Sequence, residues 1–305
     1  MESRVTILMS TYNGEEYLKE QLNSLLNQTY KNIEILIRDD GSTDNTLEIL
    51  KKYSESYDNI SFYTGKNLKP AKSFLDLIKK AENSKYYAFS DQDDVWDKDK
   101  VEIAIKMLEK EDDNLPKLYF SNTKLVDKNL NELKNIRKIY KDKLNIGNAL
   151  IENVATGCTV VFNDKLIELL KRINFDDIEN GFMHDSLAYR ICFATGNVIF
   201  DEIPHISYRQ HGNNAIGNSS NIFDKIKKRK KSLKNTLNLR SKMSKFILES
   251  FNKELKKENY KFVEMIANYN NTTRNKVKLL FCKDINRMNF WDNIMFKLAI
   301  IAGKV

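Results

Sequence analysis

The chain has 305 residues, with 50 Lys and Arg residues against 42 Asp and Glu residues and a formal net charge of +8. A chain of this length buries a full hydrophobic core without disulfides. Its three cysteines include no CxxC pair, which excludes a zinc ribbon or thioredoxin-type motif and suits a reducing compartment. No apolar run near either end approaches the roughly 20 residues of a membrane-spanning helix, and the start has no signal-peptide pattern. We therefore expect a soluble, cytoplasmic chain.

Short apolar runs alternate with helical periodicity through the first part of the chain. Strands are expected at residues 5–9, 33–37, 60–63 and 86–89, and each is followed by apolar residues at helical spacing. Four strand–helix units in succession predict an α/β fold with a mostly parallel sheet and helices on its faces. In that architecture, ligands bind just beyond the carboxyl ends of the strands.

The rest of the chain is less regular and ends in a basic region. Further strands are expected near Tyr119 and at 159–162, 198–200 and 206–208, and helices at 166–170 and 186–192. Residues 221–305 hold 21 Lys and Arg residues against 7 acidic ones, whereas residues 1–220 carry six more acidic than basic residues. We predict a globular unit over 1–220 and a basic helical C-terminal region over 221–305 that meets an anionic surface.

A cluster of carboxylates follows the strand expected at 86–89. Asp91, Asp93 and Asp94 lie within four residues, and such a cluster is electrostatically unfavourable unless a cation shares it. Oxygen ligands suit Mg²⁺ or Mn²⁺, which also bind substrate phosphates. The alternative is an acidic helix N-terminus, because Asp97 and Asp99 come next.

Polar residues also follow the first two expected strands. Asp40 could accept a hydrogen bond from a base imide, and Tyr12 could stack on a nucleobase. The alternatives are a helix cap near Thr43 for the aspartate and a buried position for the tyrosine. Because the carboxyl ends of parallel strands meet at one edge of a sheet, we expect these side chains to gather with the acid cluster.

Six strings occur in a characteristic order: STYNG, RDDGSTDNT, SDQDDVW, ATGCTVVFN, FMHDSL and YRQHGNNAIG. Together they resemble family 2 glycosyltransferases with the GT-A fold, particularly rhamnosyltransferases. The resemblance spans about 5–217. It implies a Rossmann-like, mostly parallel sheet flanked by helices, with a nucleotide-binding half over 1–115 and an acceptor half over 116–220.

The resemblance also implies roles for residues of the nucleotide-binding half. Ser10, Tyr12, Asp40 and Asp91 match positions that bind the donor nucleotide, and Tyr12 and Asp40 hold a uracil or thymine base. Asp91 matches the first aspartate of the DxD motif, close to the ribose and metal. Asp93 matches the ligand of a Mn²⁺ or Mg²⁺ ion on the donor diphosphate.

In the acceptor half, Asp185 matches the catalytic base of the family, and His211 falls where some members supply a further metal ligand. Many relatives have Glu-Asp where this chain has His184-Asp185, so His184 is predicted only to touch the acceptor or donor sugar. Gly157 and Cys158 are expected at the start of a strand beneath the acceptor. The alternatives are helix N-capping for the aspartate and a structural role for each histidine.

The C-terminal region has two interpretations. Its basic run at 225–231 could lie on anionic headgroups, with an insertion face made of Phe223, Ile226, Phe246, Phe290, Trp291, Ile294 and Phe296. Alternatively, it is a solvated helical face packed on the catalytic domain or on a second subunit. The first interpretation predicts a peripheral protein on the inner face of the cell membrane.

The chemistry of sugar transfer needs the groups that the motifs supply. Breaking the bond between an anomeric carbon and a diphosphate develops charge on the phosphate, and one carboxylate must accept the proton of the acceptor hydroxyl. A base without a covalent partner predicts inversion. We therefore predict a metal-dependent inverting glycosyltransferase that moves a sugar, plausibly rhamnose, from a dTDP or UDP donor to a polysaccharide or lipid-linked acceptor.

Two other functions remain open from the sequence. One is a nucleotide-sugar-binding protein without turnover, and the other is a nucleic-acid-binding protein acting through the basic tail. The tail has few aromatic residues between its lysines, and the acidic residues 1–220 would repel phosphates away from a metal. We therefore expect no nucleic-acid partner.

Overall fold

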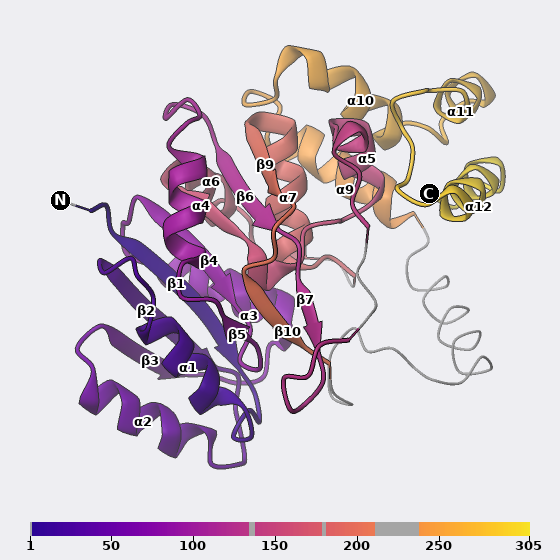
Figure 1. Cartoon of the computed structure of the whole chain (residues 1–305). Helices are drawn as coiled ribbons and strands as arrows, with labels where there is room; N and C mark the ends of the chain where they lie inside the picture. Colours follow the sequence, from indigo (N-terminus) through magenta and orange to yellow (C-terminus); the bar gives the residue numbers. More distant parts are fainter. Residues whose placement is uncertain (1, 134–137, 179–180, 211–237) are drawn as a thin grey trace.

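The structure is a computed structural model and describes residues 2–133, 138–178, 181–210 and 238–305 (Figure 1). The strands are β1 (Val5–Thr11), β2 (Ile33–Asp39), β3 (Ile60–Thr64), β4 (Tyr86–Ser90), β5 (Val95–Trp96), β6 (Lys117–Ser121), β7 (Lys124–Val126), β8 (Val161–Asn163), β9 (Asn197–Asp201) and β10 (Ile206–Arg209). The α-helices are α1 (Leu18–Leu26), α2 (Thr46–Ser56), α3 (Lys69–Lys80), α4 (Lys100–Leu108), α5 (Ile146–Ile151), α6 (Asp164–Lys171), α7 (His184–Thr195), α9 (Leu239–Ser250), α10 (Lys257–Ala267), α11 (Thr273–Leu280) and α12 (Phe290–Ile301).

A seven-stranded sheet of order β3-β2-β1-β4-β8-β6-β9 runs through the molecule. Strand β8 is antiparallel to both of its neighbours, and the other six strands run parallel to one another. This confirms the mostly parallel sheet predicted from the alternation of apolar runs and helical segments. A small second sheet of order β5-β10-β7 was not predicted, since each of its strands is very short.

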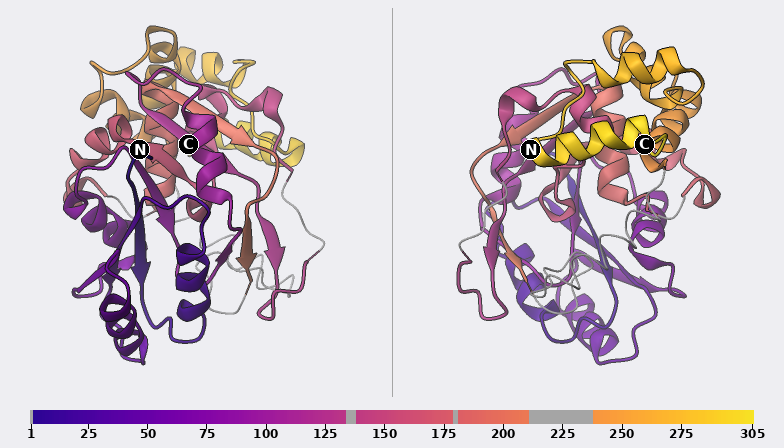
Figure 2. Two further views of the ribbon diagram at one scale, coloured as in Figure 1. Left: turned by 60° about the vertical axis from the view of Figure 1, so that its left-hand side comes forward. Right: turned by 90° about the vertical axis from the view of Figure 1, so that its right-hand side faces the viewer.

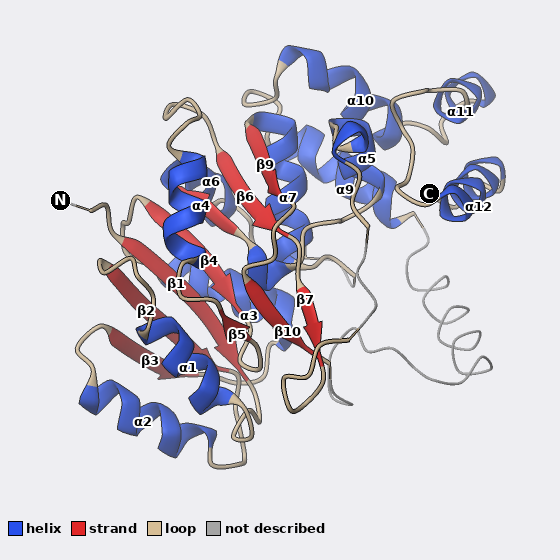
Figure 3. Cartoon of the chain, viewed as in Figure 1, coloured by secondary structure: helices blue, strands red, loops and turns tan. Residues whose placement is uncertain are grey.

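Helices cover both faces of the large sheet (Figure 3). In β1, Val5, Ile7 and Met9 point into a core shared with α1, α2 and α4, whereas Leu8 points into a second core shared with α3, α6 and α7. This alternation follows from the two-residue period of a strand. A strand that is buried on both faces must be apolar at nearly every position, which is why these strands are continuous apolar runs in the sequence.

The helices α9 and α10 pack on α5 and α7 and contribute side chains to the second core. The C-terminal helices gather at the end of the molecule away from α2 and β3 (Figure 2). Over its described residues, the C-terminal region is therefore packed on the sheet domain, as one of the two interpretations of the sequence expected. The predicted boundary between residues 220 and 221 lies outside the described part of the chain.

The segment between α11 and α12 is fastened to α5 by hydrogen bonds. The Asn148 amide donates to the carbonyl of Asn286 over 2.8 Å, and the Met288 N–H donates to the Glu152 carboxylate over 2.8 Å. Buried polar groups that are paired in this way fix one arrangement of the packed segments, since leaving them unpaired would be costly. The position of α12 therefore depends on α5.

Within the described residues, every helix is too short or too polar to cross a membrane. Helix α12, with 12 residues, is well short of the roughly 20 residues that a bilayer requires.

The contact between α5 and the C-terminal segment gives a test of this packing. A Cβ atom on Gly147 would lie 2.3 Å from the carbonyl oxygen of Asp284. We expect Gly147→Ala to lower the free energy of unfolding by about 1–3 kcal/mol through this overlap, measured by urea denaturation. The sign is decisive, because the same change in a helix that makes no such contact is stabilising by up to about 1 kcal/mol.

Candidate active site

A cavity of about 290 Å³ lies at the carboxyl ends of β1, β2 and β4. Eight of the ten residues predicted from the sequence line it: Ser10, Tyr12, Asp40, Asp91, Asp93, Gly157, His184 and Asp185. Ser10 lies near the end of β1, the next four follow β1, β2 and β4, and the other three come from the segment before β8 and from the start of α7. Parts of the chain that are up to 175 residues apart in sequence therefore meet in one cavity, as the strand-end rule predicts.

Two predicted residues do not line this cavity. His211 lies outside the described residues. Cys158 is buried beneath the cavity, because the short 3-10 turn Gly157–Thr159 directs its side chain into the core. The expectation that Gly157 and Cys158 start a strand was wrong, because both lie in this turn and β8 begins only at Val161.

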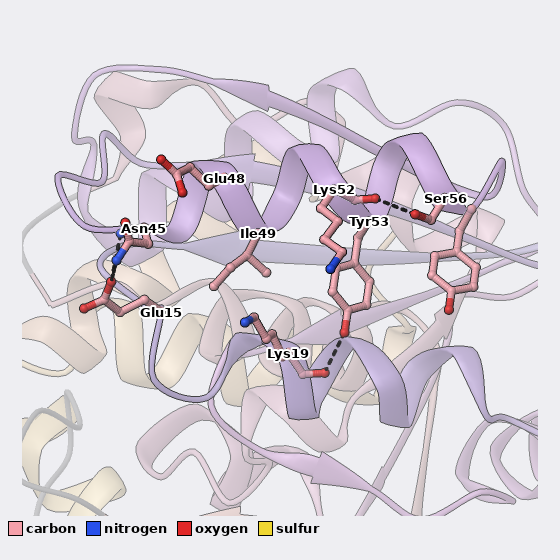
Figure 4. A pocket seen from close by; sticks show the side chains of 9 residues that line it. Glu15, Lys19, Asn45, Glu48, Ile49, Lys52, Tyr53 and Ser56 are labelled. Carbon is pink, nitrogen blue, oxygen red and sulfur yellow. Dashed lines mark hydrogen bonds between the residues drawn. The ribbon is translucent and has the colours of Figure 1, made fainter.

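A wider hollow of about 770 Å³ lies between α1 and α2 (Figure 4). Its polar groups bond to one another: the Asn45 amide donates to the Glu15 carboxylate over 2.6 Å, and the Tyr53 hydroxyl meets the Lys19 carbonyl at 3.4 Å. No residue predicted to act in catalysis or binding lines it. The hollow is therefore a surface groove and not the candidate site.

Asp40 is held by the buried guanidinium of Arg38, which was not predicted. One oxygen of Asp40 accepts hydrogen bonds from Arg38 and from the N–H of Leu68 (2.8 Å), and the other accepts from the N–H of Lys69 (3.0 Å). A carboxylate offers about four acceptor positions. The hydrogen bonds among the described residues thus leave one acceptor position on the second oxygen of Asp40, a residue that lines the cavity.

Arg38 connects this aspartate to other parts of the sheet edge. Its guanidinium also donates to Asp76 (3.0 Å), to the hydroxyl of Ser73 (3.0 Å) and to the carbonyl of Lys66 (2.9 Å). The Ser73 hydroxyl in turn lies 2.6 Å from that of Ser10. Helix α2 begins at Thr46 with Asn45 at its N-cap, so neither Asp40 nor Asp39 caps it, and the Asp39 carboxylate accepts from the N–H groups of Gly41 and Ser42 in the preceding turn.

The loops after β1 and β4 are joined by the side chain of Gln92. Its oxygen accepts from the Tyr12 N–H over 2.8 Å, and its nitrogen donates to the Tyr12 carbonyl over 3.1 Å. A Cβ atom on Gly14 would lie 2.4 Å from that same oxygen, so the close approach requires glycine. The Tyr12 side chain is 47 % exposed, which excludes the buried position considered as its alternative.

The acids after β4 lie close enough for their negative charges to repel one another. Burial, followed by the charges of Asp93 and Asp185, raises the pKa of Asp91 to about 7. Strand β5 separates this cluster from α4, which begins at Lys100. The acids therefore do not form the N-terminus of a helix, which was the alternative interpretation of the cluster.

Asp94 lies in a buried layer beneath the cavity. One of its oxygens accepts from the N–H of Arg209 over 3.1 Å, and the other has no partner among the described residues. Burial raises the pKa of Asp94 well above its ordinary value and lowers that of Lys100 to about 7. The Lys100 ammonium lies 3.3 Å from the centre of the Trp96 ring, a cation–π contact that partly replaces its lost hydration.

Arg209 ties the acid-rich loop to the rest of the domain. Besides its N–H bond to Asp94, its side chain donates to the Asp93 carbonyl over 2.8 Å and forms an ion pair with Glu20 of α1. Arg209 belongs to the string YRQHG, so its importance was detectable in the sequence, although its role was not. It is almost fully buried, and it positions the loop that carries Asp93.

Asp185 lies at the first turn of α7 and lines the cavity. Burial raises its pKa, while hydrogen bonds from the N–H of Ser186 (2.7 Å) and the amide of Asn153 (3.0 Å) and the charge of Arg190 oppose that effect. The two hydrogen bonds fix the orientation of the carboxylate. Asn153 precedes the 3-10 turn and is a positioning residue that was not predicted.

His184 forms part of the cavity wall. Its ring stacks on Phe74, with ring centres 3.7 Å apart, and meets Phe89 edge-on. Burial lowers the pKa of His184 to about 3, so the imidazole is neutral near pH 7. Among the described residues, neither ring nitrogen has a hydrogen-bond partner, which is unusual for a buried polar group and is expected where a ligand supplies the partner.

The residues present fit a divalent cation. Asp91 and Asp93 offer carboxylate oxygens to the cavity, and their mutual repulsion is the condition that a bound cation relieves. The Sγ atom of Cys158 lies within 4.8 Å of ligand oxygens of Asp91 and Asp94. Burial raises the pKa of that thiol well above its ordinary value, so it stays protonated and is a poor ligand. The remaining oxygen donors suit Mg²⁺ or Mn²⁺.

Comparison with known families agrees with this arrangement. Residues 6–170 match the family model for glycosyl transferase family 2. The chain belongs to this family. Because that match covers more than half of the chain and includes the motifs after β1, β2 and β4, the predicted membership and the predicted enzyme class, a glycosyltransferase, are both confirmed.

Curated relatives extend the likeness beyond the matched domain. The dTDP-rhamnosyl transferase RfbG of Shigella flexneri is 36 % identical over 238 residues, which cover 72 % of this chain and 76 % of that protein. The UDP-Glc:alpha-D-GlcNAc-diphosphoundecaprenol beta-1,3-glucosyltransferase WfgD of Escherichia coli is 31 % identical over 163 residues, covering 53 % and 61 %.

Solved structures show that the fold is GT-A. S. aureus TarS 1-349 in complex with UDP-GlcNAc aligns with a TM-score of 0.59 at 16 % identity, covering 98 % of this chain and 81 % of that one. The mannosyltransferase PcManGT of Pyrobaculum calidifontis, in complex with GDP-Man and Mn²⁺, aligns with a TM-score of 0.56 at 15 % identity, covering 100 % and 77 %. The fold predicted from the motifs is confirmed.

Proposed function

We propose that this family 2 glycosyltransferase is a metal-dependent, inverting enzyme that transfers rhamnose from a dTDP donor to a polysaccharide or lipid-linked oligosaccharide. The observation that carries the proposal is the meeting of Asp40, Asp93 and Asp185 in one cavity. The likeness to RfbG supports dTDP-rhamnose as the donor. The name of WfgD, which includes a diphosphoundecaprenol acceptor, supports a lipid-linked acceptor here.

The nucleoside would occupy the end of the cavity beside β1 and β2. The remaining acceptor position of Asp40 suits the imide N–H of thymine or uracil, because a carboxylate accepts but never donates when ionised. The exposed ring of Tyr12 offers a flat surface on which a base can stack. Ser10 lines the same cavity, and its hydroxyl is held by Ser73, which accepts a hydrogen bond from Arg38.

Asp91 and Asp93 would hold the metal, and a bound Mn²⁺ or Mg²⁺ would neutralise charge on the diphosphate leaving group. His211 remains a proposed further ligand. Arg209 and Gln92 keep the loop with these acids in place. That preorganisation matters because the electrostatic stabilisation of a transition state depends on groups that do not have to move.

Asp185 would act as the base. Its raised pKa increases its affinity for the proton of the acceptor hydroxyl, and the hydrogen bonds from Asn153 and Ser186 hold its orientation. With Asp91 and Asp93 assigned to the metal, Asp185 is left as the base, without a second carboxylate to act as a nucleophile. Direct attack by the acceptor inverts the anomeric carbon.

His184 would recognise a hydroxyl of the transferred or accepting sugar. A neutral imidazole donates through one nitrogen and accepts through the other, and both nitrogens of His184 lack partners among the described residues. A Cβ atom on Gly157 would lie 3.2 Å from Nε2 of this ring. Glycine there avoids a Cβ atom pressed against the polar edge of the imidazole.

Donor and metal binding provide the first test. In the presence of Mn²⁺, dTDP-rhamnose should stabilise the enzyme by about 2.7 kcal/mol at 100 times its Kd, and more than UDP-glucose or GDP-mannose at the same concentration, measured by thermal unfolding. A chelator, or Asp93→Ala, should remove most of this stabilisation. The matched control is Asp58→Ala at the exposed surface. Stabilisation of the Asp93 variant to the wild-type extent in Mn²⁺, or of the wild type equally in Mn²⁺ and in chelator, would disprove the metal assignment.

Replacing the base tests turnover separately from binding. We expect Asp185→Asn to lower the transfer rate by about 10²–10⁴-fold, since general base catalysis contributes that much, while dTDP-rhamnose affinity stays near that of the wild type. Single-turnover transfer and calorimetric binding measure the two effects, with Asp58→Asn as the control. Retained transfer by the Asp185→Asn variant would mean that another group takes the proton. If the wild type itself binds the donor but transfers no sugar, the protein is a nucleotide-sugar-binding protein without turnover.

The role of His184 predicts a selective loss. His184→Phe keeps the stacking on Phe74 but cannot form hydrogen bonds, so kcat/KM for sugar transfer should fall by about tenfold, the worth of one neutral hydrogen bond. Binding of dTDP alone should not change, and His184→Gln should recover part of the activity. Unchanged kcat/KM in the folded Phe variant would leave His184 with a packing role only.

A further inference from the structure

The outer side of the last helix, α12, is apolar and exposed, and so is Phe281 at the end of α11. Six side chains, which we call the α12 ridge, are between 52 % and 75 % exposed: Phe281, Phe290, Trp291, Met295, Leu298 and Ile301. Helix α12 forms the side of the molecule that faces the viewer in the right-hand view of Figure 2. Exposed apolar side chains that are contiguous in this way mark an interaction surface, whereas scattered ones need no explanation.

Helical geometry separates the ridge from the face that packs on the protein. Trp291, Met295 and Leu298 follow the i, i+4, i+7 spacing of one helix face, and Phe296 and Ile300 on the opposite face are buried. The predicted insertion face was therefore partly wrong, because Phe296 belongs to the core and Phe246 is half-buried beside Phe182 and Phe251. Phe290 and Trp291 are exposed and Ile294 is half-buried, whereas Phe223, Ile226 and the basic run at 225–231 lie outside the described residues.

The positive charge around the α12 ridge distinguishes between its possible partners. Residues 272–305 contain seven Lys and Arg residues and two Asp residues, a net charge of +5. Three exposed lysines lie near the ridge in the chain: Lys278 in α11, Lys283 just after α11, and Lys304 just after α12. A second copy docked ridge to ridge would bring two such positive regions together, which is unfavourable. Anionic lipid headgroups attract the lysines while the acyl region accepts the apolar side chains.

We propose that the α12 ridge docks the enzyme onto the surface of an anionic lipid membrane, with α12 lying in the plane of the interface. Large aromatic side chains such as Trp291 are favoured at that depth, since they have an apolar body and a polar N–H group. The docking rests on and extends the proposed function, because it would bring the enzyme to the membrane that contains a lipid-linked acceptor. It does not require that the donor or the acceptor be identified correctly.

Vesicle flotation of the full chain tests the docking. We expect the wild type to float with vesicles of phosphatidylcholine and phosphatidylglycerol, weakly with phosphatidylcholine alone, and less as salt is raised. The double variant Trp291→Glu and Leu298→Glu should lose at least about tenfold in apparent affinity, because two large apolar side chains no longer insert. The matched control is Ile203→Glu, an equally exposed apolar residue outside the ridge, at 63 % exposure, which should float like the wild type.

Other outcomes overturn the docking. The proposal is contradicted if the wild type does not float with the anionic vesicles, or if the double variant floats as well as the wild type. If light scattering shows a wild-type dimer that the double variant converts to a monomer, and neither protein floats, the ridge is an interface between copies. Flotation is measured without substrates and so tests the docking alone. If the enzyme floats but transfers no rhamnose, the docking proposal stands and the proposed donor is refuted.

Discussion

Mutual repulsion among acids at one edge of the sheet is the constraint on which the site depends. Asp91, Asp93 and Asp185 face a single cavity, and the pKa of Asp91 is raised to about 7 by burial and by the other two charges. A fold would gain stability by spreading such groups apart. Arg209 and Gln92 hold the loop that carries Asp91 and Asp93, and the retention of these acids beside Asp185 fits the proposed binding of a metal and a diphosphate, which would complete the charge balance.

The carboxylate at the other end of the cavity is treated differently. Asp40 has its own buried cation, Arg38, and two backbone N–H donors. It therefore needs no metal, and its remaining acceptor position suits a neutral N–H group. At one end of the cavity the charge of Asp40 is balanced by Arg38, whereas at the other end Asp91 and Asp93 repel each other. This difference matches a donor with an uncharged base at one terminus and a diphosphate near the other.

Much of the nucleotide-binding half was predictable because its signals are local. The buried strands are continuous apolar runs, and the polar motifs follow them directly, so one rule about the edge of a parallel sheet brings Tyr12, Asp40 and Asp91 together. The residues that secure the site were not predictable in this way. Arg209 bonds to Asp94 across 115 positions of sequence, and neither spacing nor periodicity reports a contact over that distance. Helix α12 shows the same limit, since an apolar helix does not reveal which of its faces meets the core.

The bridge made by Gln92 has a consequence for how this enzyme could change its donor. Its amide bonds both to the N–H and to the carbonyl of Tyr12, while Asp91 and Asp93 lie on either side of it in the chain. The two loops, which in the proposed function hold the base and the diphosphate, are therefore tied to each other by these hydrogen bonds. A substitution that reshapes the first loop to admit a purine would also displace the acids, so new nucleotide preferences should arise in this scaffold through paired changes in both loops.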